Sequence, residues 1–182
     1  MTREFVPGRL DVNGFAEAGA SISGSDPVRN YRRLHAELVE PSDELTVQWA
    51  ATGERRSGAD GSAVPWMHLT AYTLVPMVCQ RCLGAVDVGL DVDRWFRFVS
   101  DEAIAAAEDE ESEEDVLVAS RDFDLRGLVE DELLMEIPVT PRHEVCPEPA
   151  RLSAADPDFE TAEGEKPNPF AVLKQLKSDE DK

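Results

Sequence analysis

The chain has 182 residues and a mass of 20.1 kDa, which is enough for one domain or one domain with tails. Its 38 acidic and 18 basic side chains give a formal charge of −20, which argues against nonspecific coating of nucleic acid and against docking on an anionic membrane. No apolar run approaches the roughly 20 residues of a spanning helix, and the N-terminus lacks a signal-peptide core, so we expect a cytoplasmic protein. Three cysteines exclude a disulfide framework and leave metal binding, redox chemistry or burial.

The acidic charge is concentrated in two stretches. Residues 101–115 contain nine acidic side chains and no basic one, and the last thirty residues are acidic as well. Like charges at this density repel one another and bury no apolar surface, which predicts a loop and a tail. We therefore predict an N-terminal segment (1–20), an α+β domain (21–147) with an acidic disordered loop (100–115), and an acidic tail (148–182).

The first part of the domain predicts a helix and a hairpin. Ser25-Asp26-Pro27 is typical of a helix start, with a capping residue before a proline, and the helix would run to about Leu34. Alternating apolar residues over 34–38 and 45–51 predict two paired strands. The Gly- and Ser-rich stretch 52–65 predicts a flexible connection.

The second part carries the clearest patterns. Residues 67–78 are rich in β-branched and aromatic types, and 86–98 alternate apolar with polar, broken only by Arg94, which predicts two long strands. Asp124 can cap a helix whose apolar residues recur every three or four positions until Pro138. The expected fold is α+β, with an antiparallel sheet of four or more strands flanked by short helices.

Two pairs of residues predict a metal site. Cys79 and Cys82 are separated by two residues where two long strands reverse. This is the geometry of a zinc knuckle, which supplies half of a tetrahedral site. His143 and Cys146 have the same spacing after the helix and offer the two missing ligands. A set of three thiolates and one imidazole suits zinc.

Two other interpretations of the cysteine pair stay open. Cys79 and Cys82 could be reduced residues without a ligand in a hairpin. They could also form a thioredoxin-like redox pair, although that motif belongs at a helix N-terminus and no helix is predicted after Cys82.

The basic residues predict a surface rather than a catalytic centre. Each arginine is expected to be solvated or paired, but together they could form a local positive patch. The candidate members are Arg29, Arg32, Arg33, Arg55, Arg56, Arg94 and Arg97. The sequence contains no Gly-rich phosphate loop, no nucleophile elbow and no His-Glu-x-x-His, so we predict that the protein is not an enzyme.

The end of the chain predicts a docking element. After the acidic stretch, Pro167-Asn168-Pro169 leads into a short amphipathic helix over 168–177. Phe170, Leu173 and Leu176 would share one side of this helix and dock on the domain or on a partner. Arg81 in the cysteine turn is a further candidate for partner binding.

Three motifs in this order resemble the YceD family, the large ribosomal RNA subunit accumulation proteins. They are the Cys79–Cys82 turn, the helix 128–134 running into Ile137-Pro138-Val139-x-Pro141-x-His143, and the segment from Lys166 to Leu173. The resemblance implies a cytosolic, non-enzymatic factor in the synthesis, processing or stability of 23S ribosomal RNA. Its partner would be large-subunit ribosomal RNA or a basic ribosomal or assembly protein. The alternatives are a zinc-binding or thiol-redox protein using Cys79 and Cys82, and an acidic adaptor that only titrates basic partners.

Overall fold

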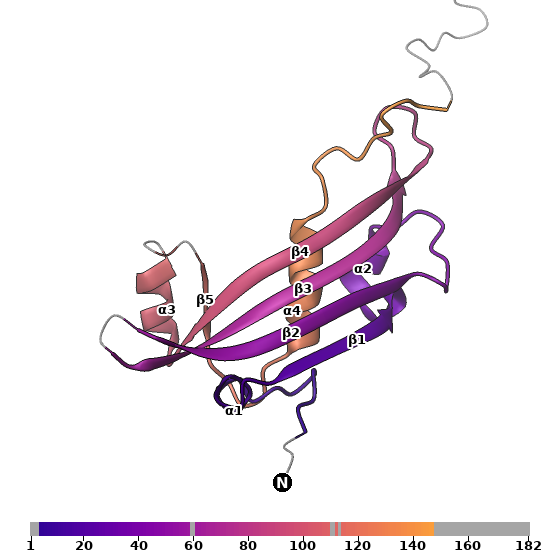
Figure 1. The fold of residues 1–182 in the computed structure, drawn as a ribbon. Coiled ribbons are helices and arrows are strands. Elements are labelled where there is room, and N and C mark those ends of the chain that lie inside the picture. The colour runs from indigo at the N-terminus through magenta and orange to yellow at the C-terminus, as the bar shows by residue number, and fades with distance from the viewer. Residues whose placement is uncertain (1–3, 59–60, 110–111, 113, 148–182) are drawn as a thin grey trace, which may run out of the picture. The chain divides into compact units, whose positions relative to one another are not determined.

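The computed structural model describes residues 4–58, 61–109, 112 and 114–147. The chain divides after Pro147, and all of the described residues belong to the first part. They form a five-stranded sheet with short helices, which confirms the predicted α+β class (Figure 1). The elements in chain order are α1 (Val12–Glu17), β1 (Ser21–Pro27), the 3₁₀ helix η1 (Val28–Asn30), α2 (Arg32–Ala36), β2 (Thr46–Ser57), β3 (Ala63–Val78), β4 (Ala85–Val99), α3 (Glu102–Asp109), β5 (Asp115–Val118) and α4 (Leu125–Met135).

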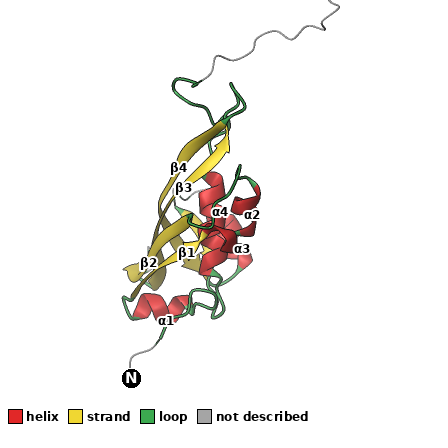
Figure 2. Ribbon diagram, turned by 90° about the vertical axis from the view of Figure 1, so that its right-hand side faces the viewer, coloured by secondary structure: helices red, strands yellow, loops and turns green. Residues whose placement is uncertain are grey.

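The sheet is mixed but mostly antiparallel. Strands β1 to β4 pair antiparallel in chain order, and the short β5 lies parallel to β4. Helices α2 and α4 lie on the same face of the sheet, as the side view shows (Figure 2). The two longest strands, β3 and β4, reverse at residues 79–84, so this turn projects from one end of the sheet.

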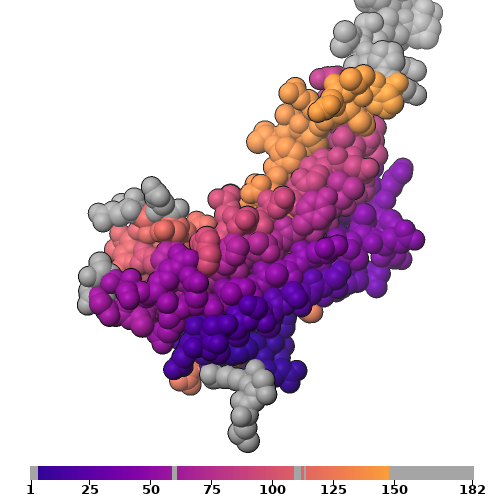
Figure 3. All heavy atoms as spheres, viewed as in Figure 1, coloured from indigo at the N-terminus to yellow at the C-terminus, as the bar shows by residue number. Residues whose placement is uncertain are grey.

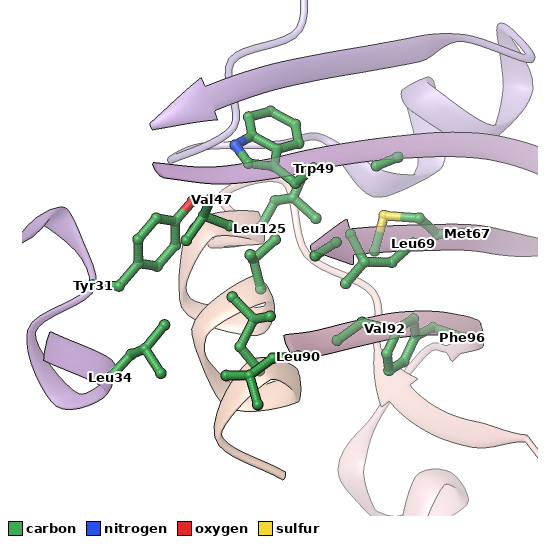
Figure 4. Packing of buried hydrophobic residues seen from close by; sticks show 14 of the residues in the cluster. Tyr31, Leu34, Val47, Trp49, Met67, Leu69, Leu90, Val92, Phe96 and Leu125 are labelled. Atoms are coloured by element: carbon green, nitrogen blue, oxygen red, sulfur yellow. The ribbon is translucent and has the colours of Figure 1, made fainter. Parts of the chain in front are cut away.

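The core lies between the sheet and α4. Alternate residues of β3 and β4, such as Leu69 and Leu90, are fully buried against this helix, and Asp124 caps its start by accepting from the backbone N–H of Gly127. The helix contributes three fully buried residues at helical spacing, as predicted: Leu125, Val129 and Leu133. Figure 4 shows Leu125 of α4 among the strand residues. Burying each such leucine stabilises the fold by about 1.5–3 kcal/mol.

The carboxylate of Asp26, at the end of β1, contacts β2, α4 and Tyr31, which lies between η1 and α2. Its Oδ2 accepts hydrogen bonds from Trp49 Nε1 at 2.8 Å and from the Tyr31 hydroxyl at 3.2 Å, while Oδ1 pairs with Arg126 of α4 at 3.3 Å. Burial and the neighbouring Asp26 carboxylate raise the pKa of Tyr31. The Asp26 side chain is only 16% exposed, so this network takes the place of solvent for its charge.

At the start of the domain, the strand predicted over 45–51 is confirmed as part of β2, but the helix predicted from Ser25 and the strand predicted over 34–38 are wrong. Ser25 to Pro27 end strand β1, whose partner is β2, and residues 34–38 lie in or directly after the short helix α2. Strand β1 has only one large apolar residue before its end, Ile22, so it shows no alternation that would reveal it. Leu34 is fully buried, and its neighbour Arg33 binds Glu130 of α4, so contact with α4 favours the helix.

The stretch 52–65 is not a flexible connection, because β2 continues to Ser57 and β3 begins at Ala63. Gly53 lies where the ring of Phe15 packs against the strand, and a Cβ on that glycine would meet Phe15 Cδ1 at 2.6 Å. Gly53 therefore marks a place where β2 and α1 pack closely, and not a flexible link.

The acidic stretch 100–115 is not wholly a loop. Residues 102–109 form α3, and Asp115 begins β5. Alanines at 103 and 105–107 favour the helix, and Asp101 accepts from the backbone N–H of Ile104 at 3.0 Å. Arg97 of β4 also forms an ion pair with Glu108. High negative charge therefore did not prevent secondary structure where helix propensity and one arginine offset it.

Candidate metal centre at the hairpin tip

The turn between β3 and β4 is a tight knuckle, defined here as residues 79–84. The N–H of Cys79 donates to Gly84 O at 2.8 Å, and the N–H of Leu83 donates to Cys79 O at 2.8 Å. Leu83 takes a φ of 63°, the left-handed conformation that closes such a turn. These bonds place the sulfur atoms of Cys79 and Cys82 on the same side of the knuckle as the segment that follows α4.

A backbone hydrogen bond brings that segment to the knuckle. The N–H of Gln80 donates to the carbonyl oxygen of the buried Pro141 at 2.8 Å. The chain leaves α4 after Met135, reaches this bond, and continues directly into His143 and Cys146. The return of the chain therefore supplies the second half of the site.

The four predicted ligands lie together. Their ligand atoms are all within 4.8 Å of one another; Cys79 Sγ lies 3.9 Å from Cys146 Sγ, and Cys82 Sγ lies 3.5 Å from His143 Nδ1. Zn–S bonds near 2.3 Å and Zn–N bonds near 2.1 Å give a tetrahedron with edges of about 3.8 Å between sulfurs and about 3.6 Å between sulfur and nitrogen. The two measured contacts match these edges, and the sulfurs are too far apart for a disulfide.

The backbone around the site favours a thiolate at Cys79. Burial acts to raise the pKa of this thiol, but backbone N–H groups from within the knuckle and from His143 outweigh burial and lower the pKa to about 5. Burial and its hydrogen bonds to Cys82 and Cys79 raise the pKa of the Cys146 thiol. Cys79 is thus prepared to carry a negative charge, and the other two thiols would release their protons to solvent when a cation binds.

Comparison with known protein families identifies the family of the chain. The sequence model of the family described as large ribosomal RNA subunit accumulation protein YceD matches residues 67–177, well over half of the chain. The chain belongs to the YceD family. No solved structure matches it. The match to the YceD family includes both halves of the metal centre and continues to residue 177, so it also spans the predicted docking segment.

The other predicted site residues have different outcomes. Arg81 is exposed on the knuckle and lines a hollow with Arg142. Phe170, Leu173 and Leu176 lie outside the described residues. None of the described helices is long and apolar enough to cross a membrane.

Acidic neighbours pair with most members of the predicted positive patch. Arg33 contacts Glu130 and Asp131, and each of four others contacts a carboxylate. These pairs are Arg29 with Asp43, Arg56 with Glu54, Arg94 with Glu136, and Arg97 with Glu108. The interpretation of each arginine as paired holds for these five.

The sequence carries no signal for the bond from Gln80 to Pro141 or for the N–H groups around Cys79. Backbone hydrogen bonds carry no residue signature, so only the folded chain reveals them. The spacing of Cys79 to Cys82 and of His143 to Cys146 was sufficient to find the ligands themselves.

Proposed function

We propose that this protein is a non-enzymatic, cytoplasmic factor that supports the accumulation of 23S ribosomal RNA and the large ribosomal subunit. We further propose that Cys79, Cys82, His143 and Cys146 hold a structural zinc ion. The observation that carries the functional part is membership of the YceD family, whose description names large ribosomal RNA subunit accumulation. The partner would be the ribosomal RNA itself or a basic protein of the large subunit.

The donor set supports zinc in a structural role. Four protein ligands close a tetrahedral site and leave no position for a substrate, whereas catalytic zinc sites keep one position open. When bound, the ion would neutralise thiolate charge and join the knuckle to the segment after α4. Cys79 would enter with its thiolate already stabilised by backbone N–H groups, and His143 would contribute Nδ1, its ring nitrogen nearest Cys82.

The functional proposal is tested in a strain that lacks the gene. We expect less 23S relative to 16S ribosomal RNA, and fewer 50S particles relative to 30S particles in a sucrose gradient. The full chain supplied in trans should restore both ratios. An unchanged 23S to 16S ratio under slow and fast growth would refute the ribosomal role.

The thiol-redox alternative draws on the backbone N–H groups around Cys79, which lower the pKa of its thiol. A low thiol pKa is expected both for a cysteine that binds a metal and for a cysteine that takes part in disulfide exchange. The two functions differ in the metal-loaded protein, since zinc protects its ligands. Rapid alkylation of a cysteine at neutral pH in protein purified without chelator would favour redox chemistry, and protection that a chelator removes would favour zinc.

A further inference from the structure

The face of the sheet opposite α2 and α4 is open along the middle of β3 and β4. The side chains that β3 directs outward include three exposed apolar residues: Tyr72 is 47% exposed, Leu74 48% and Val78 36%. Figure 1 shows this face in front of α4, and Figure 3 shows it as a surface across which β1 to β4 follow one another. A row of exposed apolar residues on the surface of a domain indicates an interaction surface.

Strand β4 places carboxylates beside this apolar row. In the register of the sheet, Asp91 is paired with Tyr72, and Gly89 is paired with Leu74. A Cβ on Gly89 would meet only the Tyr72 ring, at 3.9 Å, so the Tyr72 ring leans over β4 toward the acidic row. Asp91 is exposed and forms no ion pair with any other residue that the structure describes.

A shallow hollow connects these residues to the neighbouring strands. Tyr72 and Asp91 form one side of it, and small or uncharged side chains such as Ser25 and Gln48 line the other. An aliphatic stem can lie in such a hollow beside an aromatic ring while its cationic end reaches the carboxylate. Both lysine and arginine side chains have this combination of stem and charge.

The same face is poorly suited to nucleic acid. Its tryptophans, Trp66 and Trp95, have their rings covered: the Arg56 guanidinium lies 4.3 Å from one ring centroid and 3.9 Å from the other. His68 stacks on Trp95 at 4.5 Å and contacts Asp93 at 2.6 Å. Stacking of bases needs a free aromatic face and a positive surround. Here the tryptophan faces are occupied, and the exposed Tyr72 ring lies beside the carboxylate of Asp91.

We propose that the outer face of β3 and β4, anchored at Tyr72 and Asp91, binds an extended segment of a partner protein that is rich in lysine or arginine and contains apolar residues. Outward residues alternate along β3, so a partner segment in extended form can match them at the same spacing. The negative charge of the surface complements the positive charge of such a segment. The apolar row adds the burial of apolar side chains to the contact. This proposal rests on neither the zinc site nor the ribosomal role.

The test measures the binding of the full-length protein to a fluorescein-labelled peptide rich in arginine and leucine, by fluorescence anisotropy. Tyr72→Ala and Asp91→Asn should each weaken binding by about tenfold. Glu17→Gln removes one exposed charge from α1, outside β3 and β4, and serves as the charge-matched control. Its affinity for the peptide should stay within about twofold of that of the unchanged protein. Unchanged melting temperatures would show that the variants fold.

Three results would overturn the proposal. Equal weakening by Asp91→Asn and Glu17→Gln would mean that the peptide responds only to net charge. If Tyr72→Ala left the affinity unchanged, Tyr72 would not be an anchor of the binding surface. A fluorescent single-stranded RNA that binds the unchanged protein and is lost with Tyr72→Ala would assign the face to nucleic acid instead.

Discussion

Gln80 and Pro141 are joined by a 2.8 Å backbone hydrogen bond that links the tip of the β3–β4 hairpin to the chain beyond α4. This bond requires no metal: Gln80 lies between Cys79 and Cys82, and Pro141 lies two residues before His143. The knuckle and the returning segment therefore have one contact of their own before any ion binds. Loss of zinc should loosen this end of the molecule while the sheet and α4 stay folded.

Metal removal gives the first prediction. Protein purified without chelator should contain close to one zinc per chain, and a chelator should lower its melting temperature. Zinc binding contributes on the order of 10 kcal/mol of free energy in small zinc domains. In this protein, only the part of that free energy that is coupled to folding would raise the melting temperature. Cys82→Ser should lack zinc and show no response to chelator, whereas Gln80→Ala, at an exposed neighbouring position, should retain the metal. A zinc-free protein indifferent to chelator would contradict the site.

The lowered pKa of Cys79 predicts how the stability of the metal-free protein depends on pH. The folded-state pKa of about 5 lies below the usual thiol value of about 8.5, so the unfolded chain binds more protons between these values. Stability should therefore rise from pH 5 to about 8.5 and be lost as the pH falls toward 5. Cys79→Ser, compared in the same chelator-containing buffers, should flatten this part of the profile. Parallel profiles for the two proteins would argue against a stabilised thiolate.

The Asp26 network predicts a large loss on truncation. Asp26→Ala leaves Trp49 Nε1 and the Tyr31 hydroxyl without their acceptor and removes the partner of Arg126, which should lower the free energy of unfolding by about 2–4 kcal/mol. Urea denaturation measures this loss. Asp43→Ala, which breaks an ion pair whose carboxylate is 91% exposed, should cost less than about 1 kcal/mol. Similar losses for both variants would mean that the Asp26 contacts contribute little.

Two strand glycines form a matched pair. Gly53→Ala would place a Cβ 2.6 Å from the Phe15 ring and 2.9 Å from the Phe15 backbone, so it should destabilise the fold by about 1–3 kcal/mol. Gly89→Ala meets nothing closer than 3.9 Å and should be neutral or stabilising by up to about 1 kcal/mol. Thermal unfolding of the two variants side by side checks the difference. If both variants changed the melting temperature equally, the close contact between α1 and β2 could not be the cause of the destabilisation.

The segment 166–177 remains a predicted docking element. Replacing Phe170, Leu173 and Leu176 together by alanine should weaken partner association or co-sedimentation with ribosomal particles and leave the melting temperature nearly unchanged. Ser178→Ala, just beyond the segment, serves as the control. A large drop in melting temperature would instead mean that these residues dock on their own domain.

Elements whose residues alternate or repeat strongly were predictable from the sequence. The burial of Leu90, Val92, Phe96 and Phe98 follows the alternation of β4, and Asp124 caps α4 where the pattern placed it. These elements each bury a wide apolar face, so local pattern and tertiary packing agree.

The elements that failed depend on contacts distant in the sequence. Strand β1 is held by pairing to β2 and by the bonds of Asp26, and α2 is held by the bonds of Glu130 to the backbone N–H groups of Arg33 and Leu34. Neither element has a strong pattern of its own. The ligands of the metal centre were predictable because zinc demands particular side chains at short spacing, while the bond of Pro141 that gathers them was not.

The short length of β5 has a consequence for the behaviour of the protein in concentrated solution. Since β5 pairs with β4 only from Phe96 to Val99, residues 85–95 of β4 have a strand neighbour on one side alone within the described chain. Such an edge offers its backbone to the same strand of another molecule, which is how sheets begin to aggregate. If two β4 edges paired antiparallel around Asp91, the aspartates at 87, 91 and 93 would lie close to like charges of the other copy. Their repulsion would oppose such pairing, while a segment of opposite charge meets no such barrier.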